Sequence, residues 1–303
     1  MFKNHNNKIP KVAILLASHN GEKYMSQQID SILKQKMIKV KLFISDDLST
    51  DKTLEIISAY QKKFPKQIQF LGQRKSSKGA ADNFYHLINV VDSHDYDYFA
   101  LSDQDDIWPD HKISRAIQEM HQQNADGYSS DFLFFDETNY MQYFKKSHKQ
   151  SQLDYYFETP GPGCSFVLTK KLFEDLQSQL RNIPAMKEFI YHDWLIYAYA
   201  RSKKYRWTID AYPNLFYRQH SANVVGANHG LKASVRRINR IFFGQWYKEI
   251  RQLINIIDEP RLKNKSNWSL YWFFLSRFFQ SRRNPWHAIL MIPFLLFIGI
   301  QKQ

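Results

Sequence analysis

The sequence contains a single cysteine, Cys164, among its 303 residues. One thiol excludes an internal disulfide and the cysteine-rich kinds of zinc site, and it fits a reducing compartment. The sequence also lacks internal repeats, low-complexity tracts and an evident secretory signal, because the apolar run at residues 12–17 is short and typical of a first strand. With 44% hydrophobic residues, the chain can form one large domain or one domain with an appendage.

No apolar run reaches the roughly 20 residues that cross a bilayer. The longest candidate, residues 286–300, is shorter and contains Pro293. We expect it to form an in-plane or partly inserted membrane helix, with Arg277, Arg282 and Arg283 at the level of the lipid headgroups. The alternative is a core helix that packs on the domain and turns its basic residues to water.

Acidic residues are scarce in the last third of the chain. Residues 201–303 hold 4 acidic and 18 basic residues, whereas residues 1–200 hold 25 and 24. Basic residues mixed with aromatic runs such as 271–274 fit either nucleic acid or an anionic membrane, and we favour the membrane. The change in charge predicts a boundary near residues 225–231, with one domain over residues 1–228 and a basic, aromatic-rich helical region over residues 229–303.

The first half alternates apolar β-type runs with helical periodicity. Strands are expected at residues 11–17, 40–45, 68–71 and 98–101, and helices at residues 22–35, 54–60 and 83–91. This order predicts a three-layer α/β fold with a mainly parallel sheet, in which ligands bind at the carboxyl ends of the strands. Further on, we expect strands at 132–135, 165–168 and 207–211, and a helix at 188–200. We also expect a tight loop at 161–163, which either leaves room for a ligand or is an ordinary turn.

Polar residues follow three of the predicted strands: Ser18-His19-Asn20, Asp46-Asp47 and Asp103-Gln104-Asp105-Asp106. Carboxylates crowded at the end of a buried strand repel one another, and Mg²⁺ or Mn²⁺ would relieve that repulsion. The alternatives are a solvated acidic turn in which Asp110 caps the next helix, and a helix-capping role for the pair Asp46-Asp47.

Several segments together resemble family-2 glycosyltransferases over about residues 10–228. Residues 12–24 (VAILLASHNGEKY) and 44–53 (ISDDLSTDKT) resemble the family's opening strand and its DDxSxDxT segment. Residues 102–108 (SDQDDIW) are similar to its metal motif, and with residues 217–226 (YRQHSANVVG) they resemble the bacterial rhamnosyltransferase branch. That branch builds cell-wall or capsular rhamnose polysaccharides. One departure is that the usual Thr-Tyr-Asn reads Ser18-His19-Asn20, where the ring of His19 keeps an aromatic-like shape.

The resemblance implies a GT-A fold and an inverting transfer from a nucleotide sugar. Asp47, either alone or together with Asp46, would contact the nucleobase. Ser18, Asn20 and Glu22 would line the nucleotide pocket.

The resemblance also implies a divalent ion, Mg²⁺ or Mn²⁺. Asp103 and Asp105 would hold the ribose and this ion, and Asp106 would support them. Asp193 matches the family's base position and would take the proton of the acceptor hydroxyl; alternatively, it is a structural aspartate paired with a nearby Arg or Lys. The neighbouring His192 would orient the acceptor.

Arg218 and His220 follow a predicted strand. Arg218 could bind the diphosphate through its forked guanidinium. His220 could be a further metal ligand or a phosphate donor, or a core histidine with a satisfied hydrogen bond.

The expected donor is dTDP-β-L-rhamnose, and a UDP-hexose or UDP-N-acetylhexosamine remains an alternative. The expected acceptor is a lipid-linked glycan, which would place the chain in the cytoplasm at the inner face of the cell membrane. A nucleic-acid-binding protein is the remaining alternative, and the near-neutral first 200 residues argue against it.

Overall fold

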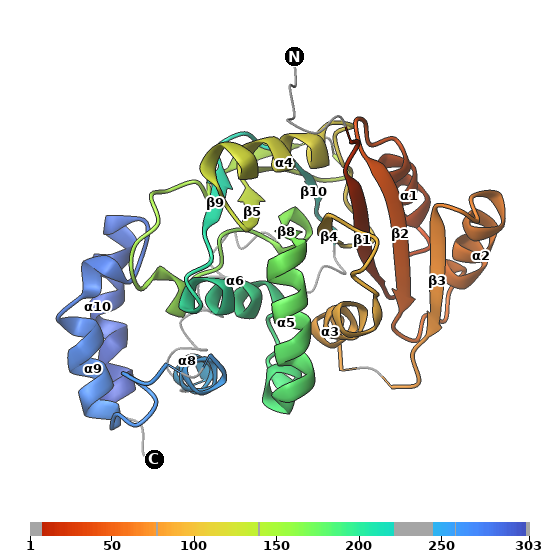
Figure 1. Cartoon of the computed structure of the whole chain (residues 1–303). Helices are drawn as coiled ribbons and strands as arrows, with labels where there is room; N and C mark the ends of the chain where they lie inside the picture. The colour runs from red at the N-terminus through yellow and green to blue at the C-terminus, as the bar shows by residue number, and fades with distance from the viewer. Residues whose placement is uncertain (1–7, 77, 139, 221–244, 258, 301–303) are drawn as a thin grey trace.

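The computed structural model describes residues 8–76, 78–138, 140–220, 245–257 and 259–300. Its centre is a seven-stranded sheet with the strand order β3-β2-β1-β4-β8-β5-β9 (Figure 1). In chain order, these strands are β1 (Lys11–Ser18), β2 (Lys39–Asp46), β3 (Ile68–Gln73), β4 (Tyr98–Ser102), β5 (Gly127–Ser130), β8 (Val167–Thr169) and β9 (Trp207–Asp210). The strands β3, β2, β1 and β4 are parallel, so the predicted mainly parallel sheet is confirmed.

The short strand β8 runs antiparallel to both of its neighbours, β4 and β5, whereas β5 and β9 are parallel to each other. The strand predicted over residues 165–168 is thus β8, but it starts only at Val167. The preceding residues, Gly163–Ser165, form a 3-10 helix, η2.

A second sheet has the order β10-β6-β7. It consists of β6 (Phe132–Phe135), β7 (Met141–Phe144) and β10 (Phe216–Arg218). The predicted strand at residues 132–135 is thus confirmed, although it lies outside the main sheet. An isolated bridge pairs Phe216 with Ile107 and so brings β10 beside the acidic segment that follows β4.

The helices are α1 (Met25–Leu33), α2 (Thr53–Lys63), α3 (Ala80–Val90), α4 (Lys112–Gln123), α5 (Lys170–Asn182), α6 (His192–Ser202), α8 (Gln245–Ile256), α9 (Asn267–Leu275) and α10 (Pro285–Ile300). Single 3-10 turns form η1 (Asp154–Tyr156), η3 (Pro184–Glu188) and η4 (Phe278–Gln280). The predicted helix over residues 188–200 begins only at His192, because η3 occupies the preceding segment.

Side chains of β1 alternate between two cores. Ala13 and Leu15 pack in the cluster that includes α3, α5 and α6, whereas Val12 and Ile14 pack in the cluster that includes α1 and α4. All four are completely buried. Because the central strand is covered on both faces, the predicted three-layer arrangement is confirmed.

The C-terminal helices α9 and α10 lie at the end of the molecule opposite β3, and α8 lies between them and α5 in this view (Figure 1). The three helices continue the core on the α6 side of the sheet, to which they contribute the fully buried Leu253, Phe274 and Leu295. Within the described part of the chain, no helix combines the length and apolar character needed to cross a membrane. The boundary predicted near residues 225–231 lies outside the described residues.

Candidate active site

The loops that follow β1, β2 and β4 meet at one edge of the sheet. Ser18, the last residue of β1, pairs in register with Asp46, the last residue of β2. The Gln104 amide of the β4 loop accepts a hydrogen bond from the His19 N–H and donates one to the His19 carbonyl, both at 2.8 Å. The predicted convergence of the three polar segments is therefore confirmed.

Asp46 is fully buried at the base of this edge. Its carboxylate accepts hydrogen bonds from Ser18 Oγ at 2.9 Å, the Ser49 N–H at 2.9 Å and Gln73 Nε2 at 3.1 Å. These bonds tie β1, β3 and the loop after β2 together. Asp46 does not cap α2, which begins at Thr53.

Asp47 is 3% exposed, and its Oδ1 lies 3.5 Å from Arg74 Nη1. Arg74 also pairs with Asp82, with 2.6 Å between Nη2 and Oδ2. The Asp47 carbonyl oxygen lies 2.6 Å from Nδ1 of His19. The sequence reasoning missed Arg74, which fixes the side chain predicted to contact the nucleobase.

Asn20 and Glu22 are exposed at the same edge. Asn20 adopts a left-handed backbone conformation, with φ of 48°, which asparagine tolerates better than most residues. Its Oδ1 accepts a hydrogen bond from the Thr50 N–H at 2.9 Å, and Glu22 Oε2 accepts one from the Lys52 N–H at 3.0 Å. Both side chains therefore hold the loop between β2 and α2 in place.

The acidic segment after β4 contacts His220. Asp105 Oδ2 lies 2.8 Å from His220 Nε2, and the His220 ring stacks on Tyr24 with 4.9 Å between ring centroids. Asp106 is buried, and its Oδ1 accepts a hydrogen bond from the Arg218 N–H at 3.1 Å. Its Oδ2 is also buried and has no nitrogen or oxygen donor among the described residues.

Burial and mutual repulsion perturb these carboxylates. Burial, with the negative charges of Asp105 and Asp193, raises the pKa of Asp103 to about 7. Burial and the charges of Asp105 and Asp103 also raise the pKa of Asp106 well above its usual range. A carboxylate cluster in this state is stabilised by a cation. The effect of Asp193 on Asp103 places the predicted base near the acidic segment.

Two further groups lie beside the cluster and were not predicted as part of it. Each of Asp103, Asp106 and Cys164 offers one atom that could bind a metal ion, and these three atoms lie within 4.8 Å of one another. Lys112 is completely buried, with Nζ 4.0 Å from the centre of the Trp108 ring and no hydrogen-bond partner among the described residues. Burial lowers the pKa of Lys112 to about 8. A lysine within the apolar stripe of α4 was the sequence signal that could have revealed it.

Arg218 is mostly buried between two rings, with its guanidinium carbon 4.4 Å from the centre of Tyr24 and 4.5 Å from that of Phe135. Its Nε donates to the Asp105 carbonyl at 2.8 Å, and its Nη2 donates to Gln27 Oε1 at 2.7 Å. Arg218 therefore fixes the backbone of the acidic segment, and its contact with a diphosphate stays a prediction.

Asp193 lies in the first turn of α6, where its Oδ1 accepts a hydrogen bond from the Trp194 N–H at 2.8 Å. It forms no ion pair with any residue that the structure describes, which disfavours the structural alternative. The adjacent His192 stacks on Phe84 with 4.2 Å between ring centroids, and burial lowers the pKa of its imidazole.

The loop at residues 161–163 does not leave room for a ligand at Gly163, contrary to the prediction. A Cβ placed on Gly163 would lie 2.3 Å from His192 Nε2, and one on Gly161 would lie 3.0 Å from Ser165 Oγ. The space at Gly163 is therefore occupied by the His192 ring. Glycine is needed here for the approach of a side chain of the same protein.

The donor set fits a hard divalent cation. Asp103, Asp105 and Asp106 supply carboxylate oxygens, which Mg²⁺ and Mn²⁺ prefer, and His220 adds an imidazole nitrogen that suits Mn²⁺. The buried, unsatisfied Oδ2 of Asp106 is the specific feature that a nearby cation would compensate.

Residues 13–177 match the family model described as glycosyl transferase family 2. The chain belongs to this family, and the predicted resemblance is confirmed. It is 39% identical over 251 residues to the dTDP-rhamnosyl transferase RfbG of Shigella flexneri, which covers 82% of this chain and 86% of that protein.

Solved structures with a similar fold include residues 1–349 of TarS from Staphylococcus aureus in complex with UDP. That structure has a TM-score of 0.57 and 15% identity over 94% of this chain and 70% of its own. The mannosyltransferase PcManGT from Pyrobaculum calidifontis, in complex with GDP-Man and Mn²⁺, has a TM-score of 0.54 and 15% identity over 97% and 87% of the two chains. The predicted GT-A-like fold is therefore confirmed.

Proposed function

We propose that this chain is an inverting rhamnosyltransferase of polysaccharide synthesis. It moves L-rhamnose from dTDP-β-L-rhamnose to a hydroxyl group of a lipid-linked glycan. The observation that carries the reaction type is that Asp193 has no ion-pair partner among the described residues and acts electrostatically on Asp103. The adjacent His192 lies against Gly163, whose neighbour Cys164 clusters with Asp103 and Asp106. The similarity to the dTDP-rhamnosyl transferase of Shigella flexneri supports the choice of donor.

Asp193 is the general base in this proposal. The acceptor hydroxyl attacks the anomeric carbon from the face opposite the leaving diphosphate, and it must lose its proton as it does so. The Trp194 N–H holds Oδ1 of Asp193, while Oδ2 has no hydrogen-bond donor among the described residues. Oδ2 is therefore the atom assigned to accept the proton.

Asp103, Asp105 and His220 would hold Mg²⁺ or Mn²⁺, with Asp106 behind them. A bound divalent ion acts as a Lewis acid that neutralises charge on a leaving phosphate. The contribution of the chain is to keep these groups in place, through the bond from the Arg218 N–H to Asp106 and the bond from Arg218 Nε to the Asp105 carbonyl.

The nucleotide would bind where the loops after β1 and β2 meet. Asp47 faces the base in this proposal, and Ser18 and Asp46 form the floor beneath it. Asn20 and Glu22 shape the rim, because they fasten the loop that precedes α2.

A donor assay tests this proposal. Turnover of dTDP-β-L-rhamnose is measured with Mg²⁺ or Mn²⁺ and a lipid-linked acceptor, with UDP-sugars in parallel, for the wild type, Asp105→Ala and Asp193→Ala. Loss of a general base typically costs about 10²- to 10⁴-fold in rate. Asp110→Ala is the matched control, because Asp110 pairs with Lys36 on the surface and should keep wild-type turnover.

Turnover of dTDP-rhamnose that disappears in both site variants supports the donor and both roles. Turnover with a UDP-sugar alone overturns the choice of rhamnose, and wild-type turnover by Asp193→Ala overturns the base.

The C-terminal helices would hold the enzyme at the cytoplasmic face of the membrane, beside its lipid-linked acceptor. Residues 260–303 contain seven basic and no acidic residues. Among the side chains of this region whose burial the structure describes, four tryptophan or phenylalanine residues are more than half exposed: Trp268, Trp272, Phe279 and Trp286. Aromatic side chains among basic residues suit the interface of an anionic membrane.

Vesicle sedimentation of the full-length protein tests this contact. Deleting the region would also remove core residues such as Phe274, so surface substitutions are preferable. Trp272→Ser combined with Trp286→Ser should weaken binding to anionic vesicles, whereas Tyr140→Ser, an exposed position outside the C-terminal region, should not. Equal binding by all three proteins contradicts the proposal.

A further inference from the structure

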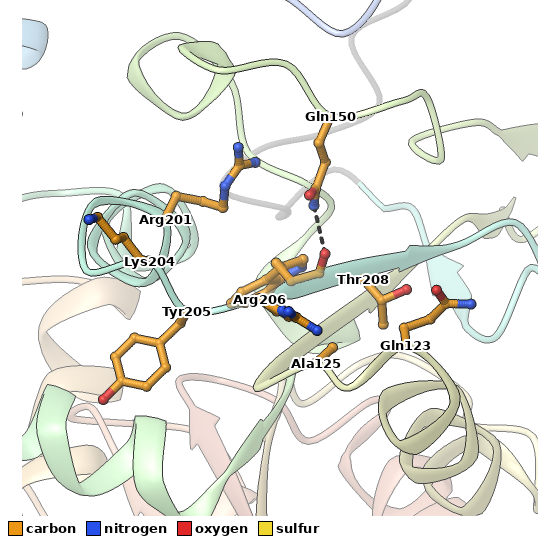
Figure 2. A pocket seen from close by; sticks show the side chains of 9 residues that line it. Gln123, Ala125, Gln150, Arg201, Lys204, Tyr205, Arg206 and Thr208 are labelled. Carbon is orange, nitrogen blue, oxygen red and sulfur yellow. Dashed lines mark hydrogen bonds between the residues drawn. The ribbon is translucent and has the colours of Figure 1, made fainter.

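A groove lies at the end of α6 remote from Asp193. Two cavities, with volumes of about 400 and 530 Å³, share Arg201 and Lys204 as lining residues. Arg206 also lines the first cavity, and Glu259 and Arg261 line the second. We call this surface the α6 groove. Figure 2 shows Arg201 and Lys204 at the end of α6 and Arg206 on the segment that leads into β9.

The α6 groove has an excess of positive charge. Arg201 pairs with the buried Asp154, with 3.1 Å between Nη1 and Oδ1, and Asp154 also pairs with Arg283. The side chains of Lys204, Arg206 and Arg261 are exposed and form no ion pair or hydrogen bond with the described residues. Among the described residues that line the two cavities, Glu259 is the one carboxylate.

Lys204 occupies a backbone position that normally favours glycine. The Tyr205 N–H donates to the Ala200 carbonyl at 2.9 Å, and the Lys204 N–H donates to the Arg201 carbonyl at 3.1 Å. These two bonds form a Schellman motif, in which Lys204 takes the left-handed position with φ of 64°. The motif fixes the end of α6 at this position, and the Lys204 side chain lines both cavities.

We propose that the α6 groove binds the phosphate group of an anionic ligand, at a place separate from the nucleotide-sugar site. Arg201 lies eight residues after Asp193, which corresponds to about 12 Å along the helix. Lys204 supplies a point charge, and Arg206 and Arg261 supply forked donors, which is the combination that recognises phosphate oxygens. The phosphate belongs either to a lipid headgroup or to a soluble molecule, since both present the same chemistry to these side chains.

Two binding measurements on the full-length protein test the proposal. Inorganic pyrophosphate is titrated by calorimetry in the presence of EDTA. Sedimentation with phosphatidylglycerol vesicles is compared with sedimentation with phosphatidylcholine vesicles. The variants are Lys204→Gly and Arg206→Gln. The matched control is Lys203→Gln, because Lys203 is an exposed lysine next in the chain that lines neither cavity.

Both groove variants should weaken binding at least tenfold, while Lys203→Gln binds as the wild type does. Lys204→Gly should retain the wild-type melting temperature or exceed it, because glycine relieves the left-handed strain. Loss of pyrophosphate binding identifies a soluble ligand, and loss confined to phosphatidylglycerol vesicles identifies a lipid headgroup. Wild-type binding by both groove variants, or equal losses in Lys203→Gln, overturns the proposal.

Discussion

Replacing Gly163 by alanine should disturb α6, the helix that carries the proposed base, through one steric contact. The new Cβ would lie 2.3 Å from His192 Nε2 and 3.0 Å from its Cδ2. Non-bonded heavy atoms rest about 3.5 Å apart, so the ring must move by roughly 1 Å. Gly163 does not have a positive φ, so the effect is steric and not conformational.

The His192 ring has little freedom to yield. It stacks on Phe84, whose side chain is fully buried. The movement must therefore pass into the first turn of α6, which carries Asp193. Overpacking typically costs about 1–3 kcal/mol in stability, and a 1 Å displacement of a catalytic group can cost about 10²-fold in rate.

The assay combines urea unfolding with sugar-transfer kinetics. Gly163→Ala should lower the free energy of unfolding by about 1–3 kcal/mol and reduce kcat by about 10²-fold. In a His192→Ala background, Gly163→Ala should no longer lower the free energy of unfolding, because the clash disappears. Gly161→Ala is the control, since its Cβ would approach Ser165 Oγ only to 3.0 Å. Wild-type stability and kcat in Gly163→Ala would refute the reasoning.

Two further predictions concern buried charges. Because the pKa of Asp103 rises from 3.8 to about 7 on folding, the folded chain binds this proton more tightly than the unfolded chain. As the pH rises from about 4 to about 7, the free energy of unfolding of the metal-free protein should therefore fall. Asp103→Asn should make this fall smaller, as measured by urea titrations in the presence of EDTA. An unchanged slope in the variant contradicts the assignment. Arg283→Met should cost more than about 1 kcal/mol in the same assay, because Arg283 Nη1 lies 3.4 Å from Oδ2 of the buried Asp154, which then keeps, among the described residues, only its pair with Arg201. Lys36→Met, which breaks the exposed pair with Asp110, should cost less than about 1 kcal/mol, and equal losses would argue against a buried ion pair.

The parallel half of the fold could be predicted because each of its elements carries a local signal. The buried strand β1 is a continuous apolar run, β2 is apolar and buried over residues 42–44, and α3 buries Phe84, Leu87 and Ile88 at helical spacing. Polar residues directly after such strands must meet at one edge of a parallel sheet. The meeting of Ser18, Asp46 and the acidic segment therefore followed from strand order alone.

The contacts that support the site could not be predicted in this way, because they join segments far apart in sequence. Arg74 reaches Asp47 from the end of β3, and Arg218 reaches the Asp105 carbonyl from β10. The strand β8 contributes only three residues, and its antiparallel direction is set by pairing with β4 and β5. The role of Gly163 depends on His192, which lies 29 residues further along the chain.

One helix, α6, connects the three functional regions proposed for this enzyme. Its first turn carries Asp193. In its middle, Tyr197 donates a hydrogen bond to Asp154 at 2.8 Å, and Asp154 also pairs with Arg283 of the C-terminal region. Its last turn carries Arg201 of the α6 groove. A buried helix has a fixed rise per residue, so the proposed base, the attachment of the C-terminal helices and the groove keep constant separations. An acceptor that is held at the membrane surface or in the groove would therefore reach Asp193 over a distance that the fold itself sets.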